Sequence, residues 1–100
     1  MKVKLTASAW RRLRQIRSYY KKSGNSREGR KISHDILKKS KTLAEYPYLG
    51  QEEENFKKLG QGHRYLLVGK LYKIIYFIAK PFIYITDIFD TRQNPNKMKP

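Results

Sequence analysis

Cations near the start of the chain form the first group of residues that could do chemistry. Only Glu28 and Asp35 carry negative charge in the first 41 positions, against fourteen Lys and Arg. Closely spaced cations can follow a phosphate backbone, and such binding depends strongly on salt. A solvated helix face is the alternative, but the scarcity of acidic residues favours nucleic-acid binding. The residues predicted to bind are Arg11, Arg12, Arg14, Arg17, Lys21 and Lys22.

The two histidines could act as acid or base near neutral pH. His63 begins a predicted strand and faces away from its neighbour Arg64 by strand alternation, so we expect a packed or surface side chain. His34 lies in a predicted helix, where a solvated side chain is expected. The chain has no cysteine, which excludes disulfides, thiolate metal sites and a cysteine nucleophile. We therefore expect neither a metal nor a cofactor.

The composition indicates one small folded unit with a polyanionic or acidic partner. One hundred residues with 39% hydrophobic and 13% aromatic content suffice for one core and argue against disorder. A formal net charge of +15 attracts nucleic acid, the ribosome, an anionic membrane surface or an acidic protein. Charge alone does not separate these partners.

Two segments raise the question of a membrane, and neither supports one. Arginines from position 11 onward interrupt the N-terminal segment before a signal-peptide core can form. The apolar stretch from Leu71 to Phe89 contains Lys73, Pro81 and Asp87, so two strands and a turn explain it better than a membrane span. We expect a cytoplasmic protein with no membrane contact.

The periodicity of the first half predicts a strand and two helices. Alternation of Val3 and Leu5 with lysines indicates a short edge strand at the N-terminus. A helical period follows from Thr6 or Ser8 to about Gly24, and a second helix extends from Ser26 to about Ala44. Pro47 prevents its continuation.

The second half predicts a sheet for the helical hairpin to cover. Residues 48–62 are interpreted as a loop with one irregular strand around Phe56. Residues 63–68, 71–78 and 82–89 are rich in Tyr, Ile, Val and Phe and should form an antiparallel meander. The predicted fold is α+β: a short N-terminal strand and an α-helical hairpin packed on this meander. We expect one domain over residues 1–95 and a disordered tail at 96–100.

Four short segments, in this order and spacing, carry a family resemblance. They are Tyr46-Pro47-Tyr48-Leu49-Gly50, His63-Arg64-Tyr65-Leu66, Tyr72-Lys73-Ile74-Ile75-Tyr76 and Asp90-Thr91-Arg92-Gln93-Asn94-Pro95. Over residues 3–95 the chain resembles the RelE/ParE superfamily of bacterial toxins. RelE-like members cleave messenger RNA on the ribosome without a metal, and ParE-like members poison DNA gyrase. The resemblance implies a growth-arresting toxin and a cognate acidic antitoxin as partner.

The resemblance to RelE-like nucleases implies a catalytic set of Arg64, Lys73 and Arg92. Lys73 departs from the arginine of the family and lacks its bidentate fork. A second departure is that no Tyr or His follows Tyr84, where such nucleases often carry one. We favour a ribosome-dependent mRNA endonuclease, because the charge suits a ribosomal RNA surface. The first alternative is a gyrase poison that cleaves nothing, supported by the long helical hairpin and by the ParE-like segment from Asp90 to Pro95. The second is an inactive basic relic.

The nuclease hypothesis makes a geometric prediction. If Gly69-Lys70 is a two-residue turn, Val68 pairs with Leu71, and Leu66 pairs with Lys73. Arg64 and Lys73 then share a face as diagonal neighbours about 7–8 Å apart. A two-residue turn at Lys80-Pro81 would pair Phe77 with Tyr84 and Lys73 with Ile88, and Arg92 would join this face if the strand continued past Asp90. A three-residue turn at Ala79-Lys80-Pro81 would instead send Arg92 to the other face.

Overall fold

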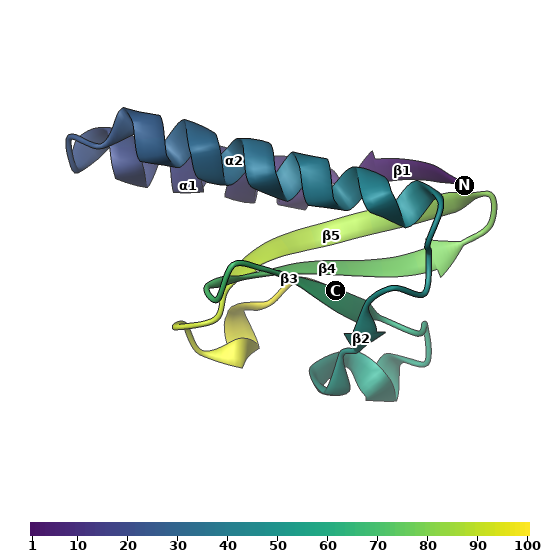
Figure 1. Ribbon diagram of the computed structural model, residues 1–100. Coiled ribbons are helices and arrows are strands. Elements are labelled where there is room, and N and C mark those ends of the chain that lie inside the picture. The colour runs from purple at the N-terminus through teal and green to yellow at the C-terminus, as the bar shows by residue number, and fades with distance from the viewer.

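A computed structural model describes all residues from 1 to 100 as a helical hairpin lying over one face of a five-stranded sheet (Figure 1). The order in the sheet is β1-β5-β4-β3-β2, with β1 parallel to β5 and the other pairs antiparallel. The predicted α+β architecture is confirmed. The strands are β1 (Lys2–Leu5), β2 (Gln51–Glu52), β3 (Arg64–Val68), β4 (Tyr72–Ala79) and β5 (Phe82–Asp90).

The two helices end close to the predicted positions. Helix α1 covers Ala7–Lys22, and the Thr6 hydroxyl caps it by accepting from the Ala9 N–H at 3.2 Å. Gly24 adopts φ 75° in the turn that leads to α2 (Ser26–Lys41). A short 3-10 helix, η1 (Thr42–Ala44), follows before Pro47. The hairpin is longer than the sheet beneath it, so its tip projects past the strands (Figure 1).

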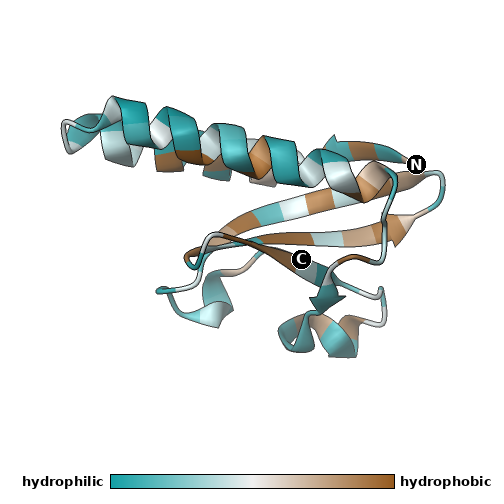
Figure 2. Cartoon of the chain, viewed as in Figure 1, coloured by the Kyte–Doolittle hydropathy of each residue, from teal (hydrophilic) through white to brown (hydrophobic).

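The main core lies between the hairpin and the sheet. The helices contribute buried Leu13, Ile16 and Ile36, while β4 and β5 contribute Ile74, Ile85 and neighbouring residues. Figure 2 shows apolar colour along the sheet and hydrophilic colour over the outward side of the helices. This arrangement removes one apolar face of the sheet from water, which is the main stabilising contribution in such a layered fold.

The segment between α2 and β3 differs from the prediction. Phe56 lies in a 3-10 helix, η2 (Glu54–Leu59), and the short strand β2 comes before it. The local cause is Glu53, whose side chain accepts from the Asn55 N–H at 3.2 Å and so caps η2. The expected irregular strand around Phe56 is therefore wrong.

The C-terminal residues also differ from the prediction. After the 3-10 helix η3 (Pro95–Lys97), Met98 is buried against Ile75 and Phe89 on the face of the sheet that the hairpin leaves open. Hydrogen bonds tie Lys99 to β5: its N–H donates to Asp87, and its carbonyl accepts from Thr86. Met98 and Lys99 thus contact the fold, because Ile75 and Phe89 on this face offer Met98 an apolar surface to cover, whereas residues 96–100 were expected to be disordered.

The apolar stretch that raised the membrane question forms β4, the Lys80-Pro81 turn and β5, as predicted. Among the helices of the structure, none combines the length and the apolar character that a membrane crossing requires.

Candidate functional site

The pairing of β3 with β4 places Arg64 and Lys73 on opposite faces of the sheet. Val68 lies opposite Tyr72, so Leu67 pairs with Lys73 and Arg64 pairs with Tyr76. The loop therefore has three residues, Gly69 to Leu71, with Gly69 at φ 60°. One extra loop residue reverses the face of every side chain on the following strand relative to the prediction. The predicted convergence of Arg64 and Lys73 is wrong.

The pairing of β4 with β5 separates Arg92 from both. Phe77 faces Tyr84 as predicted, but an irregularity after Ile75 leaves Thr86 unpaired and places Lys73 opposite Phe89 instead of Ile88. The last pair of the ladder joins Tyr72 to Asp90, so Arg92 lies beyond the end of the sheet. Tyr72 lies four residues along β4 from Tyr76, the partner of Arg64, and this spacing corresponds to about 13 Å along the strand.

Each of the three predicted catalytic cations already has a partner within the protein. The Arg64 Nε donates to the Gly50 carbonyl at 2.9 Å. The Lys73 ammonium lies 2.9 Å from a carboxylate oxygen of the buried Glu53. Arg92 donates two hydrogen bonds to Asp90, at 2.8 and 3.1 Å, which lower the pKa of that carboxyl group and raise the pKa of the guanidinium.

Arg64 belongs to a network that holds the Pro47-to-Gly50 segment against the sheet. The hydroxyl of Tyr76 donates to the Pro47 carbonyl at 2.8 Å and accepts from the Gly50 N–H at 2.9 Å. A Cβ at Gly50 would lie 2.6 Å from the Tyr65 carbonyl oxygen and 2.6 Å from the Tyr76 hydroxyl, so only glycine fits. Burial raises the pKa of Tyr76 and keeps it a neutral donor. The Arg64 contacts are therefore structural.

Lys73 belongs to a second buried group on the opposite face. Burial opposes ionisation of Glu53, but hydrogen bonds from Lys73 and Asn55 outweigh it and lower its pKa. Nearby, His63 lies between the rings of Phe56 and Phe77, with ring centroids 5.0 and 5.2 Å away. Its ring nitrogens have no hydrogen-bond partner in the protein, and burial lowers its pKa. His63 is thus a packed histidine.

The predicted nucleic-acid-binding series on α1 divides into separate groups. Arg12 bonds to the buried Asp87 at 2.9 Å, and its guanidinium also donates to the Lys97 carbonyl at 3.3 Å. Arg11 and Arg12 both line a hollow that also includes Lys99. Lys22 lines neither this hollow nor the groove described next. The other three cations of the series remain together on the surface of the hairpin.

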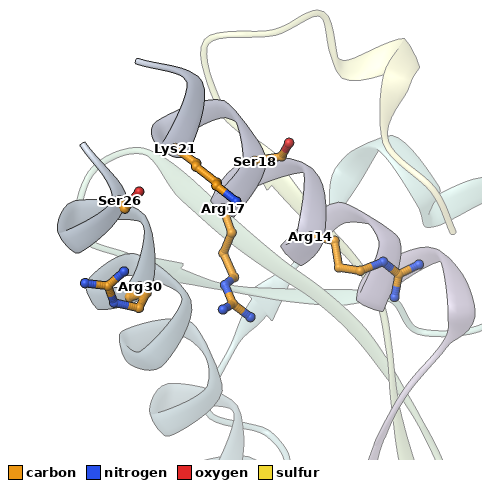
Figure 3. Close-up of a pocket in the computed structure, with 6 residues that line it drawn as sticks. All are labelled: Arg14, Arg17, Ser18, Lys21, Ser26 and Arg30. Carbon is orange, nitrogen blue, oxygen red and sulfur yellow. The ribbon is translucent and has the colours of Figure 1, made fainter. Parts of the chain in front are cut away.

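We call this surface the hairpin groove. It is a hollow of about 420 Å³ between α1 and α2 that contains no apolar and no acidic lining residue (Figure 3). Its α2 residues were not part of the predicted series, because the sequence predicts a helical hairpin but not which side chains of the second helix face the first. The groove is lined by Arg14, Arg17, Ser18 and Lys21 of α1 and by Ser26 and Arg30 of α2.

An apolar hollow lies where α1, α2 and β1 meet, and we call it the Trp10 hollow. The Trp10 side chain is 44% exposed there, beside Val3, Leu5 and Leu37. The remaining lining residues are polar or charged: His34, Lys38, Ser40 and Lys41. An exposed apolar surface edged by cations has the chemistry of a protein-binding site for an acidic partner.

Comparison with known proteins gives one family and one fold. Residues 3–95 match the family model described as "ParE toxin of type II toxin-antitoxin system, parDE". Among solved structures, the chain is similar to one titled "Chromosomal ParDE TA system from P. aeruginosa", with a TM-score of 0.75 and 22% identity over 90% of this chain and 95% of that one. No curated protein matches the sequence.

Proposed function

The chain belongs to the ParE toxin family of type II toxin–antitoxin systems, and we propose that it arrests growth by binding its target without cleaving RNA. The family places it within the RelE/ParE superfamily that its sequence resembles, and implies a cognate antitoxin. The mechanism of arrest is the part that we infer from the geometry.

The separation of the three candidate catalytic cations carries this proposal. Metal-free RNA cleavage needs a base, a group that stabilises the phosphorane and an acid, all acting on one phosphodiester. Arg64 and Lys73 lie on opposite faces of the sheet, and Arg92 lies beyond its end. Lys73 and Arg92 are in ion pairs, and Arg64 bonds to the backbone. This arrangement supports binding in preference to catalysis.

We propose that the target of the toxin is DNA gyrase. The support is the resemblance of the Asp90-to-Pro95 segment to ParE-like members, which act on gyrase, together with the family match. In this chain the segment is ordered by the Asp90 carboxylate, which accepts from the Arg92 backbone N–H as well as its guanidinium. A poison needs such a preorganised binding surface and no acid–base pair.

We further propose that the acidic antitoxin covers the Trp10 hollow and the free edge of β1. The hollow supplies an exposed tryptophan, a residue type that often carries much of an interface's binding energy. Strand β1 pairs only with β5, so its other edge is free to take an added strand. Lysines at positions 2, 4, 38 and 41 surround this surface with positive charge.

Induction of the full chain in bacteria without antitoxin tests the proposed mechanism. Colony counts should fall, gyrase-linked DNA breaks and a DNA-damage response should appear, and messenger RNA should stay uncut at early times. The control is co-expression of the cognate antitoxin, which should restore growth. Rapid cleavage of messages before any DNA damage would overturn the non-cleaving mechanism, and unchanged colony counts would overturn toxicity.

A further inference from the structure

The hairpin groove has the chemistry of a phosphate-binding surface, and we propose that it binds the phosphodiester backbone of duplex DNA. This inference goes beyond growth arrest and does not depend on which enzyme the toxin inhibits. The groove contains three cations of the series predicted from the sequence, together with one further cation and two serine hydroxyls. Its groups are Arg14, Arg17, Ser18, Lys21, Ser26 and Arg30.

The charges of the groove have no partner within the protein. Arg14, Arg17, Lys21 and Arg30 are exposed and make neither an ion pair nor a side-chain hydrogen bond. Arg12, Lys73 and Arg92, by contrast, are all in ion pairs. Like charges three and four residues apart on a helix repel one another. An anion held in the groove would relieve this repulsion.

The fold brings cations from two helices together at this point. Gly29 of α2 lies against α1 so closely that a Cβ there would be 2.9 Å from the Tyr20 Cβ and 3.5 Å from the Arg17 Cα. This close approach places Arg30 beside the cations of α1, and Figure 3 shows side chains from both helices around the hollow. The position near the projecting tip of the hairpin leaves the groove accessible to a large ligand (Figure 1).

The start of α2 adds to the positive potential. Ser26 is the first residue of α2 and lines the groove, while Asn25 before it makes no side-chain capping bond. The first N–H groups of a helix and its dipole favour an anion at this end. Glu28 lies in the same turn but does not line the groove.

The lining of the groove favours a duplex backbone over the other polyanions. Single-stranded nucleic acid is bound largely by stacking of its bases on aromatic side chains, and the groove has none. An acidic protein partner needs apolar contact area, which the groove also lacks and the Trp10 hollow supplies. Arg14 and Lys21 are about 10 Å apart along the helix, a span of about three nucleotides in one DNA strand.

Binding of a random-sequence 30-base-pair DNA duplex to the purified full chain tests the proposal. Fluorescence anisotropy between 50 and 200 mM salt should show that the logarithm of the affinity falls linearly with the logarithm of the salt concentration. Each phosphate contact should contribute about −0.9 to the slope. The variant R17A/R30A should bind about tenfold more weakly at low salt and flatten the slope by about 1.8. R14A/K21A, which removes the other two cations, should show the same effect.

The matched control is K57A/K58A, which removes two exposed lysines of η2 and leaves the same net charge as the groove variants. Its affinity should stay within about twofold of the unmodified chain. Equal losses for groove and control variants would show binding by overall charge and overturn the proposal. A groove-dependent affinity for an acidic peptide or for single-stranded DNA, without one for the duplex, would overturn it as well. Circular dichroism confirms that each variant is folded.

Discussion

The guanidinium of Arg12 on α1 and the carboxylate of Asp87 on β5 form a two-point ion pair, with Nε to Oδ1 at 2.9 Å and Nη2 to Oδ2 at 3.4 Å. The Asp87 side chain is fully buried and also accepts from the backbone N–H groups of Ile88 and Lys99. One carboxylate therefore connects the first helix, the central region of the sheet and the C-terminal tail.

The first prediction concerns this ion pair. Arg12→Ala should lower the free energy of unfolding by about 3 kcal/mol, because it leaves the charge of Asp87 buried without its cation. Urea unfolding followed by circular dichroism measures the change. The neighbouring exposed Arg11→Ala serves as control and should stay within about 0.5 kcal/mol of the unmodified chain. Equal stability of the two variants would show that the backbone N–H groups alone satisfy Asp87.

The second prediction concerns the hydroxyl of Tyr76. Tyr76→Phe keeps the ring but removes the hydrogen bonds to Pro47 and Gly50, so the free energy of unfolding should fall by about 1–3 kcal/mol. Gly50→Ala should cost at least as much, because its Cβ would lie 2.6 Å from two oxygen atoms. Urea unfolding measures both. A Tyr76→Phe variant as stable as the unmodified chain would contradict the structural role of this network.

The third prediction concerns the pH dependence of stability. Burial lowers the pKa of His63 in the folded chain, so the unfolded chain takes up the proton first as the pH falls below about 6.5, and the folded state loses stability. Glu53 has a lowered pKa in the folded chain, so its contribution to stability is lost at more acidic pH. The loss begins near about pH 4.3, the ordinary pKa of a glutamate, and is complete below the pKa in the folded chain. Free energies of unfolding at pH 7.5 and 5.5 test the histidine step.

In that experiment His63→Leu should reduce the difference between the two pH values. His34→Leu, which removes an exposed histidine, should leave that difference as in the unmodified chain. The assignment to His63 fails if both variants retain the full difference.

The fourth prediction separates the Lys73–Glu53 ion pair from toxicity. The paired variant K73M/E53Q removes both charges together and avoids leaving one of them buried alone. Because Lys73 lies on the face opposite Arg64, the variant should still reduce colony counts after induction. Antitoxin binding and circular dichroism control for folding. If the folded variant no longer arrests growth, the prediction is wrong and Lys73 belongs to a functional site.

The fifth prediction concerns the antitoxin. Trp10→Ala should weaken binding of the cognate antitoxin at least tenfold, because an exposed tryptophan in an apolar hollow has the character of an interface anchor. The association rate should also fall as salt rises, since opposite charges steer the encounter. Calorimetry and stopped-flow measurements test the two parts. Tyr46→Ala, at a tyrosine that is 62% exposed outside the hollow, should bind as the unmodified chain does.

The sequence alone was sufficient to predict the family and most of the elements. Hydrophobic periods of about 3.6 and 2 residues are local properties, and so are the breaks at Gly24, Pro47 and Lys80-Pro81. The helices, the edge strand and the three long strands therefore appear close to their predicted positions. The pairing of Phe77 with Tyr84 was predictable for the same reason, because one short turn connects the two residues.

Only the tertiary structure decided which of the candidate functional side chains meet. A loop one residue longer than predicted and an unpaired Thr86 changed the faces and partners of Arg64, Lys73 and Arg92. The pairing of Arg12 with Asp87 depends on packing between segments far apart in the sequence, and the shared lining of the hairpin groove by Arg17 and Arg30 depends on packing between the two helices. Side chains alternate between faces with a period of two residues along a strand, so a shift of a single residue moves a cation to the other side of the sheet.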